Sequence, residues 1–406
     1  MTVARTLRGL TVRTVALDRP VDLAAFAGDD GLLYEHDGAG LAGRGVAMRI
    51  SGRLAELPER VTRALHSISS HDDVGLPGCG PVAMGALPFD PDAEGSMVIP
   101  ATVVGRAADG TSWMTTVAGW PEETAPMPVE RRPPDRFTLD AVRSHEDWCE
   151  AVARAVEVIR SGRLDKVVLA REVRVEANRP ILPVDVLGRL RTLYPSCRLF
   201  SVEGFVGASP EILISRCETT VRSHPLAGTI PRSGNPAADD ALAEALLGSQ
   251  KDRWEHRLVV EEVAAALTPH CEVLEVPEGP SIVPLRNVSH LGTAIVGRLH
   301  PDGPDALTLA ALLHPTPAVG GTPTREALSL IAELEGLDRG RYAGAVGWVD
   351  GNGDGEFAVG IRSAELDGSS ARLFAGVGVV ADSDPAAELA ETQLKLQALL
   401  AAVVRP

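Results

Sequence analysis

The chain has 406 residues, of which 45% are hydrophobic and 23% charged, and its formal net charge is −16. This length suits one large domain or two ordinary ones, and the acidic balance argues against non-specific binding of nucleic acid. No apolar run reaches about 18 residues, so no membrane span is predicted, and five scattered cysteines indicate a reducing, cytoplasmic setting without a disulfide framework or zinc site.

The first 120 residues predict strands and short helices separated by Gly and Pro, and they contain no catalytic constellation. The Pro-rich, charged segment 121–135 is the best candidate for a domain boundary, although it also fits a loop across one domain's surface. Ser144 is a typical N-cap for an amphipathic helix over 144–161, and a strand over 164–177 follows it.

The middle of the chain alternates helices with strands. A helix is predicted over 181–194 and two strands over 198–216, the second interrupted at Ser209-Pro210-Glu211. Residues 223–232 read as a loop of small residues that could form a wall against a ligand. A long helical region over 237–268 is broken near Gly248, and the spacing of its charged residues alone favours a solvated face.

Two further segments complete this middle part. Residues 287–299 predict one strand, and 314–335 predict a Pro/Gly loop that runs into a helix capped at Thr322 or Thr324.

The strongest local signals lie between residues 341 and 395. A hairpin is predicted over 344–361 around the turn sequence DGNGDG, and a strand over 372–380 contains two glycines that suggest a close approach to its backbone. Asp384-Pro385 then begins a helix that places two carboxylates and one ammonium on a single face: Glu388, Glu391 and Lys395. This combination predicts a site for an anion and a metal ion.

Lysine is scarce in this chain. Of the 39 basic residues only three are lysine, namely Lys166, Lys251 and Lys395, and the others are arginine. A protein can make an ammonium give up its proton, whereas a guanidinium stays charged. Each lysine is therefore a candidate for a chemical role, with chance survival as the alternative.

Eight motifs occur in a fixed order between residues 140 and 404, and together they resemble the chorismate-utilising enzymes. This family includes isochorismate synthase, salicylate synthase, anthranilate synthase component I and aminodeoxychorismate synthase. The motifs are DKVVLAR, SPEIL, HPLAGTIPR, KDRWEHRLVVEEV, SHLGT, HPTPAVGGTP, GAVGWVDGNGDGEFAVGIRSAEL and FAGVGVVADSDPAAELAETQLKL.

The resemblance implies an α+β fold with a large antiparallel β core of two packed sheets wrapped by helices. It implies a single chorismate-binding domain over residues 1–406. Residues 1–135 would complete the β core, and residues 140–404 would form the catalytic core that carries all the motifs.

The resemblance also implies a site. Chorismate is the expected substrate and Mg²⁺ the expected cofactor, with Glu255 and Glu388 resembling the metal ligands and Glu391 lying beside them. The family's substrate contacts fall, by position, on Ala227, Gly228, Thr229, His290, Arg362, Gly376, Gly378 and Lys395.

Within the family, water-using members carry a lysine in the DKVVLAR motif, as this chain does. The resemblance therefore implies an isochorismate synthase, an isomerase that adds water at C2 of chorismate and expels the C4 hydroxyl. Lys166 would act as the general base for water and Glu211 as the general acid for the leaving hydroxyl.

Three alternatives stay open: a salicylate synthase, a non-catalytic chorismate-binding homologue, and an ammonia-using synthase. The motifs depart from the isochorismate synthase pattern at Gln250, Gly292 and Ser363, which leaves a pyruvate-lyase side activity open. The isochorismate synthase interpretation needs no amidotransferase subunit and predicts a monomer. It does not decide between siderophore and menaquinone biosynthesis.

Overall fold

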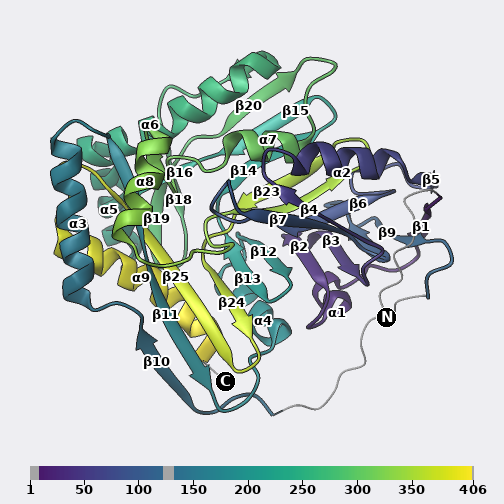
Figure 1. Ribbon diagram of the computed structural model, residues 1–406, viewed down its shortest axis with the longest axis horizontal. Helices are drawn as coiled ribbons and strands as arrows, with labels where there is room; N and C mark the ends of the chain where they lie inside the picture. Colours follow the sequence, from purple (N-terminus) through teal and green to yellow (C-terminus); the bar gives the residue numbers. More distant parts are fainter. Residues whose placement is uncertain (1–8, 122–131, 405–406) are drawn as a thin grey trace.

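The structure is a computed structural model that describes residues 9–121 and 132–404, and most of the predicted boundary segment 121–135 lies outside them. Two large β-sheets occupy its centre and helices lie around them (Figure 1). No helix in the described part of the chain is long and apolar enough to cross a membrane.

The larger sheet joins strands from the first 120 residues to strands from the C-terminal third. β1 and β5 pair in parallel, and the other pairs among its described strands are antiparallel. Across the sheet the order is β10 (Phe137–Ala141), β11 (Lys166–Ala177), β25 (Ser370–Val379), β24 (Ser363–Asp367), β13 (Phe205–Ser209), β12 (Arg198–Val202), β2 (Leu32–His36), β3 (Ala39–Arg44), β8 (Thr102–Arg106), β9 (Ser112–Val117), β1 (Thr11–Leu17) and β5 (Ser69–Asp72), with β21 (Gly321–Thr322) paired to β11.

The second large sheet and a small third sheet are antiparallel. The second has the order β17 (Cys271–Glu275), β20 (Ile295–Leu299), β15 (Thr220–His224), β14 (Ile212–Cys217), β23 (Gly355–Val359), β22 (Ala345–Asp350), β6 (Val82–Ala86), β7 (Glu94–Ile99) and β4 (Met48–Arg53). The third consists of β16 (Leu226–Pro231), β19 (Val288–Gly292) and β18 (Ser281–Pro284).

The helices cover the outer faces of these sheets. Their bounds are α1 (Leu23–Ala27), α2 (Leu57–His66), α3 (His145–Arg160), α4 (Pro183–Leu193), α5 (Pro236–Gly248), α6 (Gln250–Leu267), α7 (Ala306–Leu313), α8 (Thr324–Leu334) and α9 (Pro385–Val404). The Ser144 hydroxyl accepts from the Asp147 amide to begin α3, and the Asp384 carboxylate accepts from the Ala387 amide to begin α9. Both N-caps confirm the sequence prediction.

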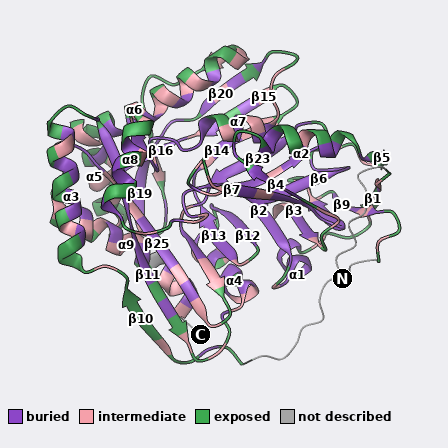
Figure 2. Ribbon diagram, viewed as in Figure 1, coloured by how far each residue is buried: buried purple, intermediate pink, exposed green. Residues whose placement is uncertain are grey.

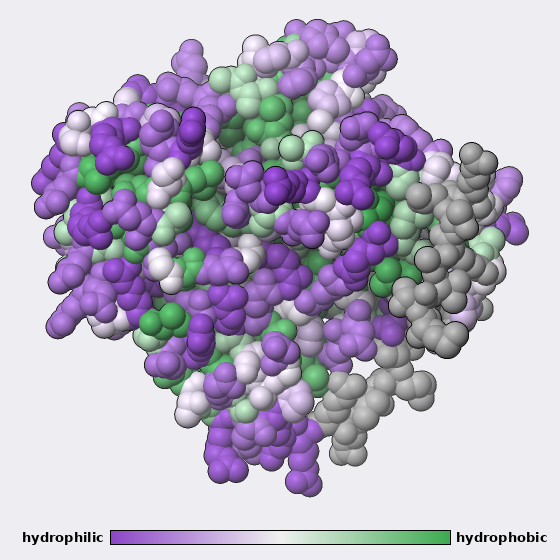
Figure 3. Space-filling model, viewed as in Figure 1, coloured by the Kyte–Doolittle hydropathy of each residue, from purple (hydrophilic) through white to green (hydrophobic). Residues whose placement is uncertain are grey.

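Apolar side chains from both large sheets form one core between them, including Phe200 and Phe205 from one sheet and Met84 and Val346 from the other. α4 and α9 pack on the opposite face of the larger sheet. Figure 2 shows the buried strands inside and the exposed helix faces outside. On the face drawn in Figure 3, hydrophilic residues predominate and apolar residues are scattered among them.

Two segments differ from the sequence prediction. The expected loop at 223–232 is mostly strand, because the backbone of β16 pairs with β19. Gly228, at φ 72°, sits where that register shifts. The expected single strand at 287–299 is two strands, β19, which ends at Gly292, and β20. They belong to different sheets, β19 to the third and β20 to the second.

Helix ends also differ from expectation. Pro323 precedes α8 and provides no side-chain cap, so neither Thr322 nor Thr324 caps this helix. Both threonines instead donate hydrogen bonds to the carboxylate of Glu262 on α6, which the sequence had assigned to a solvated helix face.

Candidate active site

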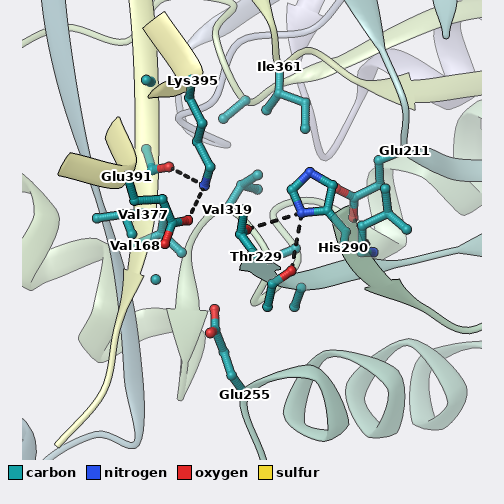
Figure 4. A pocket seen from close by; sticks show the side chains of 18 of the residues that line it. Val168, Glu211, Thr229, Glu255, His290, Val319, Ile361, Val377, Glu391 and Lys395 are labelled. Atoms are coloured by element: carbon teal, nitrogen blue, oxygen red, sulfur yellow. Dashed lines mark hydrogen bonds and ion pairs between the residues drawn. The ribbon is translucent and has the colours of Figure 1, made fainter. Parts of the chain in front are cut away.

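A cavity opens where β25 and β16 face α6 and α9, and it encloses about 880 Å³ of empty space, counting its open mouth. Figure 4 shows side chains from opposite walls pointing into it, with Glu255 on one side and Lys395 and Glu391 on the other. Twelve of the thirteen residues that the sequence proposed line this cavity: Glu211, Ala227, Gly228, Thr229, Glu255, His290, Arg362, Gly376, Gly378, Glu388, Glu391 and Lys395.

Arg362 and His290 form a cationic corner of the cavity. Arg362 Nη2 lies 3.1 Å from His290 Nε2, and His290 Nδ1 lies 3.2 Å from the carbonyl oxygen of Gly228 and 3.1 Å from the hydroxyl of Thr229. A guanidinium only donates, so Nε2 accepts and the ring proton lies on Nδ1. Burial, followed by the charges of Arg362 and Lys395, holds the pKa of His290 well below its usual range, and the ring is therefore neutral.

Arg362 is built into this corner under strain. Its φ is 52°, in the left-handed region that costs a residue with a Cβ roughly 1–2 kcal/mol. Its carbonyl oxygen accepts from the Ala208 amide at 3.1 Å. Its Nη1 atom is buried without a hydrogen-bond partner among the described residues. A buried, unpaired donor on a guanidinium is costly unless an anion binds there, so this corner is suited to a carboxylate.

Glu211 lies between β13 and β14 and is 3% exposed. Burial raises the pKa of this carboxyl to about 8, and the Leu226 amide and the charges of Lys166 and Lys395 lower it less strongly. The Leu226 amide lies 3.4 Å from Oε1. At neutral pH the cavity therefore contains a carboxylic acid that can donate a proton.

The three lysines of the chain meet three glutamates at this site. Each ammonium pairs with a different carboxylate: Lys166 with Glu255 at 2.9 Å, Lys251 with Glu388 at 3.1 Å, and Lys395 with Glu391 at 2.8 Å. Lys395 also donates to the carbonyl oxygen of Gly376 at 2.9 Å. The sequence analysis assigned Lys166 and Lys395 to the site, and the structure adds Lys251.

Lys166 differs from the other proposed residues because it lies behind the cavity wall. Its side chain is 1% exposed, and it does not line the cavity itself but pairs with Glu255, which does. A Cβ at Gly378 would lie 2.1 Å from Glu255 Oε1 and 3.0 Å from Lys166 Cε. The missing side chain at position 378 therefore makes room for this ion pair.

The strand that carries both glycines has an open edge at the cavity. β24 pairs with β25 from Ser370 to Leu373, whereas β11 pairs with β25 through Val379. Beyond Leu373 the β24 side of β25 borders the cavity, and a polar group of a ligand can approach the backbone there because Gly376 and Gly378 have no side chains.

The carboxylates meet the chemical requirements of Mg²⁺ but are not gathered around one point. Mg²⁺ prefers oxygen ligands and takes only one or two carboxylates from a protein. Glu255 and Glu388 both reach the cavity. In the part of the chain that the structure describes, no group of three acidic, histidine or cysteine side chains is arranged to hold a metal ion. Each of the three carboxylates is instead paired with a lysine.

Several lining residues were not proposed from the sequence. Asp252 lies beside Lys251 on α6, and Tyr342, Ala343 and Ile361 are among the other residues of the wall. The Tyr342 ring stacks on Phe374 with centroids 5.0 Å apart. The scarcity of lysine was a signal for Lys251, whereas the aromatic and aliphatic wall residues have no local sequence signature.

A profile of the chorismate binding enzyme family matches residues 119–404. The chain belongs to this family. The isochorismate synthase DhbC of Bacillus subtilis is 38% identical over 365 residues, which cover 87% of this chain and 85% of that protein.

Two solved structures of relatives give the same result for the fold. MenF, the menaquinone-specific isochorismate synthase of Escherichia coli, matches with 25% identity and a TM-score of 0.82 over 98% of this chain and 95% of that one. Anthranilate synthase component I of Streptococcus pneumoniae matches with 22% identity and a TM-score of 0.69 over 98% of this chain and 94% of that one. The predicted α+β fold of the chorismate-utilising enzymes is thus confirmed.

Proposed function

We propose that this chain is an isochorismate synthase, which converts chorismate to isochorismate by adding water at C2 and releasing the C4 hydroxyl. The observation that carries the proposal is that the cavity contains a neutral carboxylic acid, Glu211, and that the charge of the buried Lys166, which does not line the cavity, acts on this acid. The family relationship and the isochorismate synthases among its relatives support the same activity.

The cationic corner would bind one carboxylate of chorismate. Arg362 offers an unpaired Nη1 donor there, and the neutral ring of His290 fixes the orientation of the guanidinium. The small residues Ala227 and Gly228 leave space for the ring beside this corner. A carboxylate bound in this way would supply the hydrogen bond that Nη1 lacks. The contact would therefore contribute more binding free energy than the same contact at an exposed arginine.

Glu211 would act as the general acid. Its proton passes to the C4 oxygen, which leaves as water, while a water molecule whose proton is accepted by Lys166 adds at C2 and the ring double bonds shift. The substrate gains one water and loses one, so the net change is an isomerisation. This role requires the neutral form of the Lys166 amine at the moment of reaction.

Mg²⁺ is proposed as the cofactor, and when bound it would supply a positive charge that offsets a substrate carboxylate beside the glutamates. Glu255 and Glu388 would hold it, with Glu391 nearby. Charge balance supports this proposal. The three lysine–glutamate pairs are neutral, so the two carboxylates of chorismate need more positive charge than Arg362 alone provides.

Product analysis tests the function. Chorismate and Mg²⁺ are added to the purified protein and the products are separated by chromatography, with isochorismate as the expected product. Fluorescence of salicylate would identify a salicylate synthase instead. Product formation only with ammonia and an amidotransferase would identify an ammonia-using synthase, and no product at all would identify a non-catalytic homologue.

A further inference from the structure

Among the three lysines of the site, Lys251 is the one whose ammonium can move out of the cavity into solvent. Its side chain is 38% exposed, whereas the side chains of Lys166 and Lys395 are 1% and 17% exposed. Lys251 lies near the start of α6, four residues before Glu255, so both side chains extend from the same face of the helix. A long, flexible and partly exposed stem allows its ammonium to turn out to solvent at little cost.

The ammonium of Lys251 lies close to carboxylates that could also hold a metal ion. It forms an ion pair with Glu388, and the charge of Glu255 also acts on it. These two glutamates come from different helices, α6 and α9, 133 positions apart in the chain. They are the same two carboxylates that would hold the metal ion. One ammonium therefore lies in the field of both proposed metal ligands.

We propose that Lys251 is a placeholder for the divalent cation: its ammonium balances Glu388 and Glu255 in the metal-free enzyme and turns out to solvent when the metal ion binds. This inference rests on the proposed Mg²⁺ site. It makes Lys251 a positioning residue that keeps Glu388 directed into the cavity before metal entry and lowers metal affinity by competition.

The placeholder has a consequence for the second ion pair. Lys166 pairs with Glu255 and is 1% exposed, so it cannot follow Lys251 into solvent. If Glu255 turned from Lys166 to hold a metal ion, the Lys166 ammonium would lose its partner. Displacement of Lys251 by the metal ion would then also leave Lys166 unpaired.

Isothermal titration of Mg²⁺ into substrate-free protein tests the proposal without any reaction. Lys251→Met keeps the aliphatic stem and removes the charge, and it is expected to tighten Mg²⁺ binding by roughly tenfold, because a competing cation 3.1 Å from Glu388 Oε1 is gone. Lys251→Arg keeps the charge, and its affinity for Mg²⁺ should stay at or below that of the wild type. Unchanged or weaker binding in Lys251→Met would overturn the proposal.

A matched control removes a positive charge from a different face of the same helix. Arg257 is 56% exposed and pairs with Glu261 one turn later, so Arg257→Met should leave Mg²⁺ affinity within about twofold of the wild type. An equal gain in both variants would mean that net charge alone explains it, which would also overturn the proposal.

Nuclear magnetic resonance provides a second measurement, because selective ¹³Cε labelling of lysine yields only three side-chain signals in this chain. The signal that is absent in Lys251→Arg belongs to Lys251. It is expected to move toward the position of a solvated lysine as Mg²⁺ is added, with the same dissociation constant as the calorimetry. A Lys251 signal that stays in place while Mg²⁺ binds would refute the displacement.

These outcomes separate this inference from the proposed function. If the wild type binds no Mg²⁺, the metal site itself fails. If it binds Mg²⁺ and yields isochorismate but Lys251 does not move, only the placeholder fails.

Discussion

The proton on Glu211 can be tested by replacing this residue with glutamine, which keeps the size and a hydrogen-bond donor but holds no transferable proton. The variant should bind chorismate and lose roughly 10²–10⁴-fold in kcat, the usual contribution of a general acid. In the wild type, kcat should fall as the pH rises above about 8, because the acid form of this buried carboxyl is then lost.

The same proton changes the stability of the protein. The pKa of Glu211 is about 8 in the folded state and 4.5 in an exposed glutamate, so between these values the folded state holds a proton that the unfolded state releases. The free energy of unfolding therefore falls with rising pH across this window, by about 1.4 kcal/mol per pH unit. The full interval corresponds to about 5 kcal/mol, and the fall stops above the folded pKa.

Urea unfolding of the wild type and Glu211→Gln at pH 5, 6, 7 and 8 measures this effect. The variant should gain stability relative to the wild type with each step, since glutamine has no proton to lose. Glu333→Gln serves as the control, because Glu333 is 60% exposed in a surface ion pair with Arg154 and should follow the wild-type profile.

Two results would refute the reasoning about Glu211. A constant difference between wild type and Glu211→Gln from pH 5 to pH 8 would show that the native carboxyl is already ionised. Wild-type kcat in the variant would show that another group protonates the leaving hydroxyl.

Three further predictions concern the same cavity. Lys166→Ala should lower kcat by roughly 10²–10⁴-fold while calorimetry still detects chorismate binding, and turnover at the wild-type rate would remove Lys166 from the mechanism. Gly378→Ala should separate Glu255 from Lys166, because its Cβ would lie 2.1 Å from Glu255 Oε1. We expect this variant to fold with a near-normal melting temperature and to lose activity, and full activity would contradict the packing at this position. Arg362→Lys should raise the KM for chorismate by roughly 10–100-fold, because lysine cannot provide the second donor, and steady-state kinetics with an unchanged KM would contradict its role as a carboxylate ligand.

Much of the fold follows from local patterns. The hairpin of β22 and β23 forms around the DGNGDG turn as expected, and α9 begins at Asp384-Pro385 as expected. These elements depend on turn and capping chemistry that acts within a few residues. The prediction of a loop at 223–232 was wrong because the structure of this segment depends on a distant partner. Its strand character comes from β19, some sixty residues later, and small residues flanked by prolines give no local sign of that partner.

The site residues could be predicted where a single helix carries them. Contacts between elements that are far apart in the sequence could not be predicted. Helical spacing alone placed Glu388, Glu391 and Lys395 on one face of α9, and the structure brings all three to the cavity. The pairing of Lys251 with Glu388 joins residues 137 positions apart, so spacing could not reveal it. The roles of these residues as metal and substrate ligands, like the absence of a partner subunit, stay predictions.

The use of lysine joins these observations. All three lysines of an otherwise arginine-rich chain pair with the three glutamates proposed for the metal site. Arginine would bind a carboxylate through a wide planar fork and could not give up its proton, whereas an ammonium is a compact charge on a flexible stem. A site that exchanges a protein cation for a metal ion, and that needs an amine able to accept a proton, has physical reasons to use lysine. Replacing Lys166 with arginine would keep the charge balance of the cavity but remove the proton acceptor, whereas arginine at position 251 would keep a competing charge in a larger, planar group.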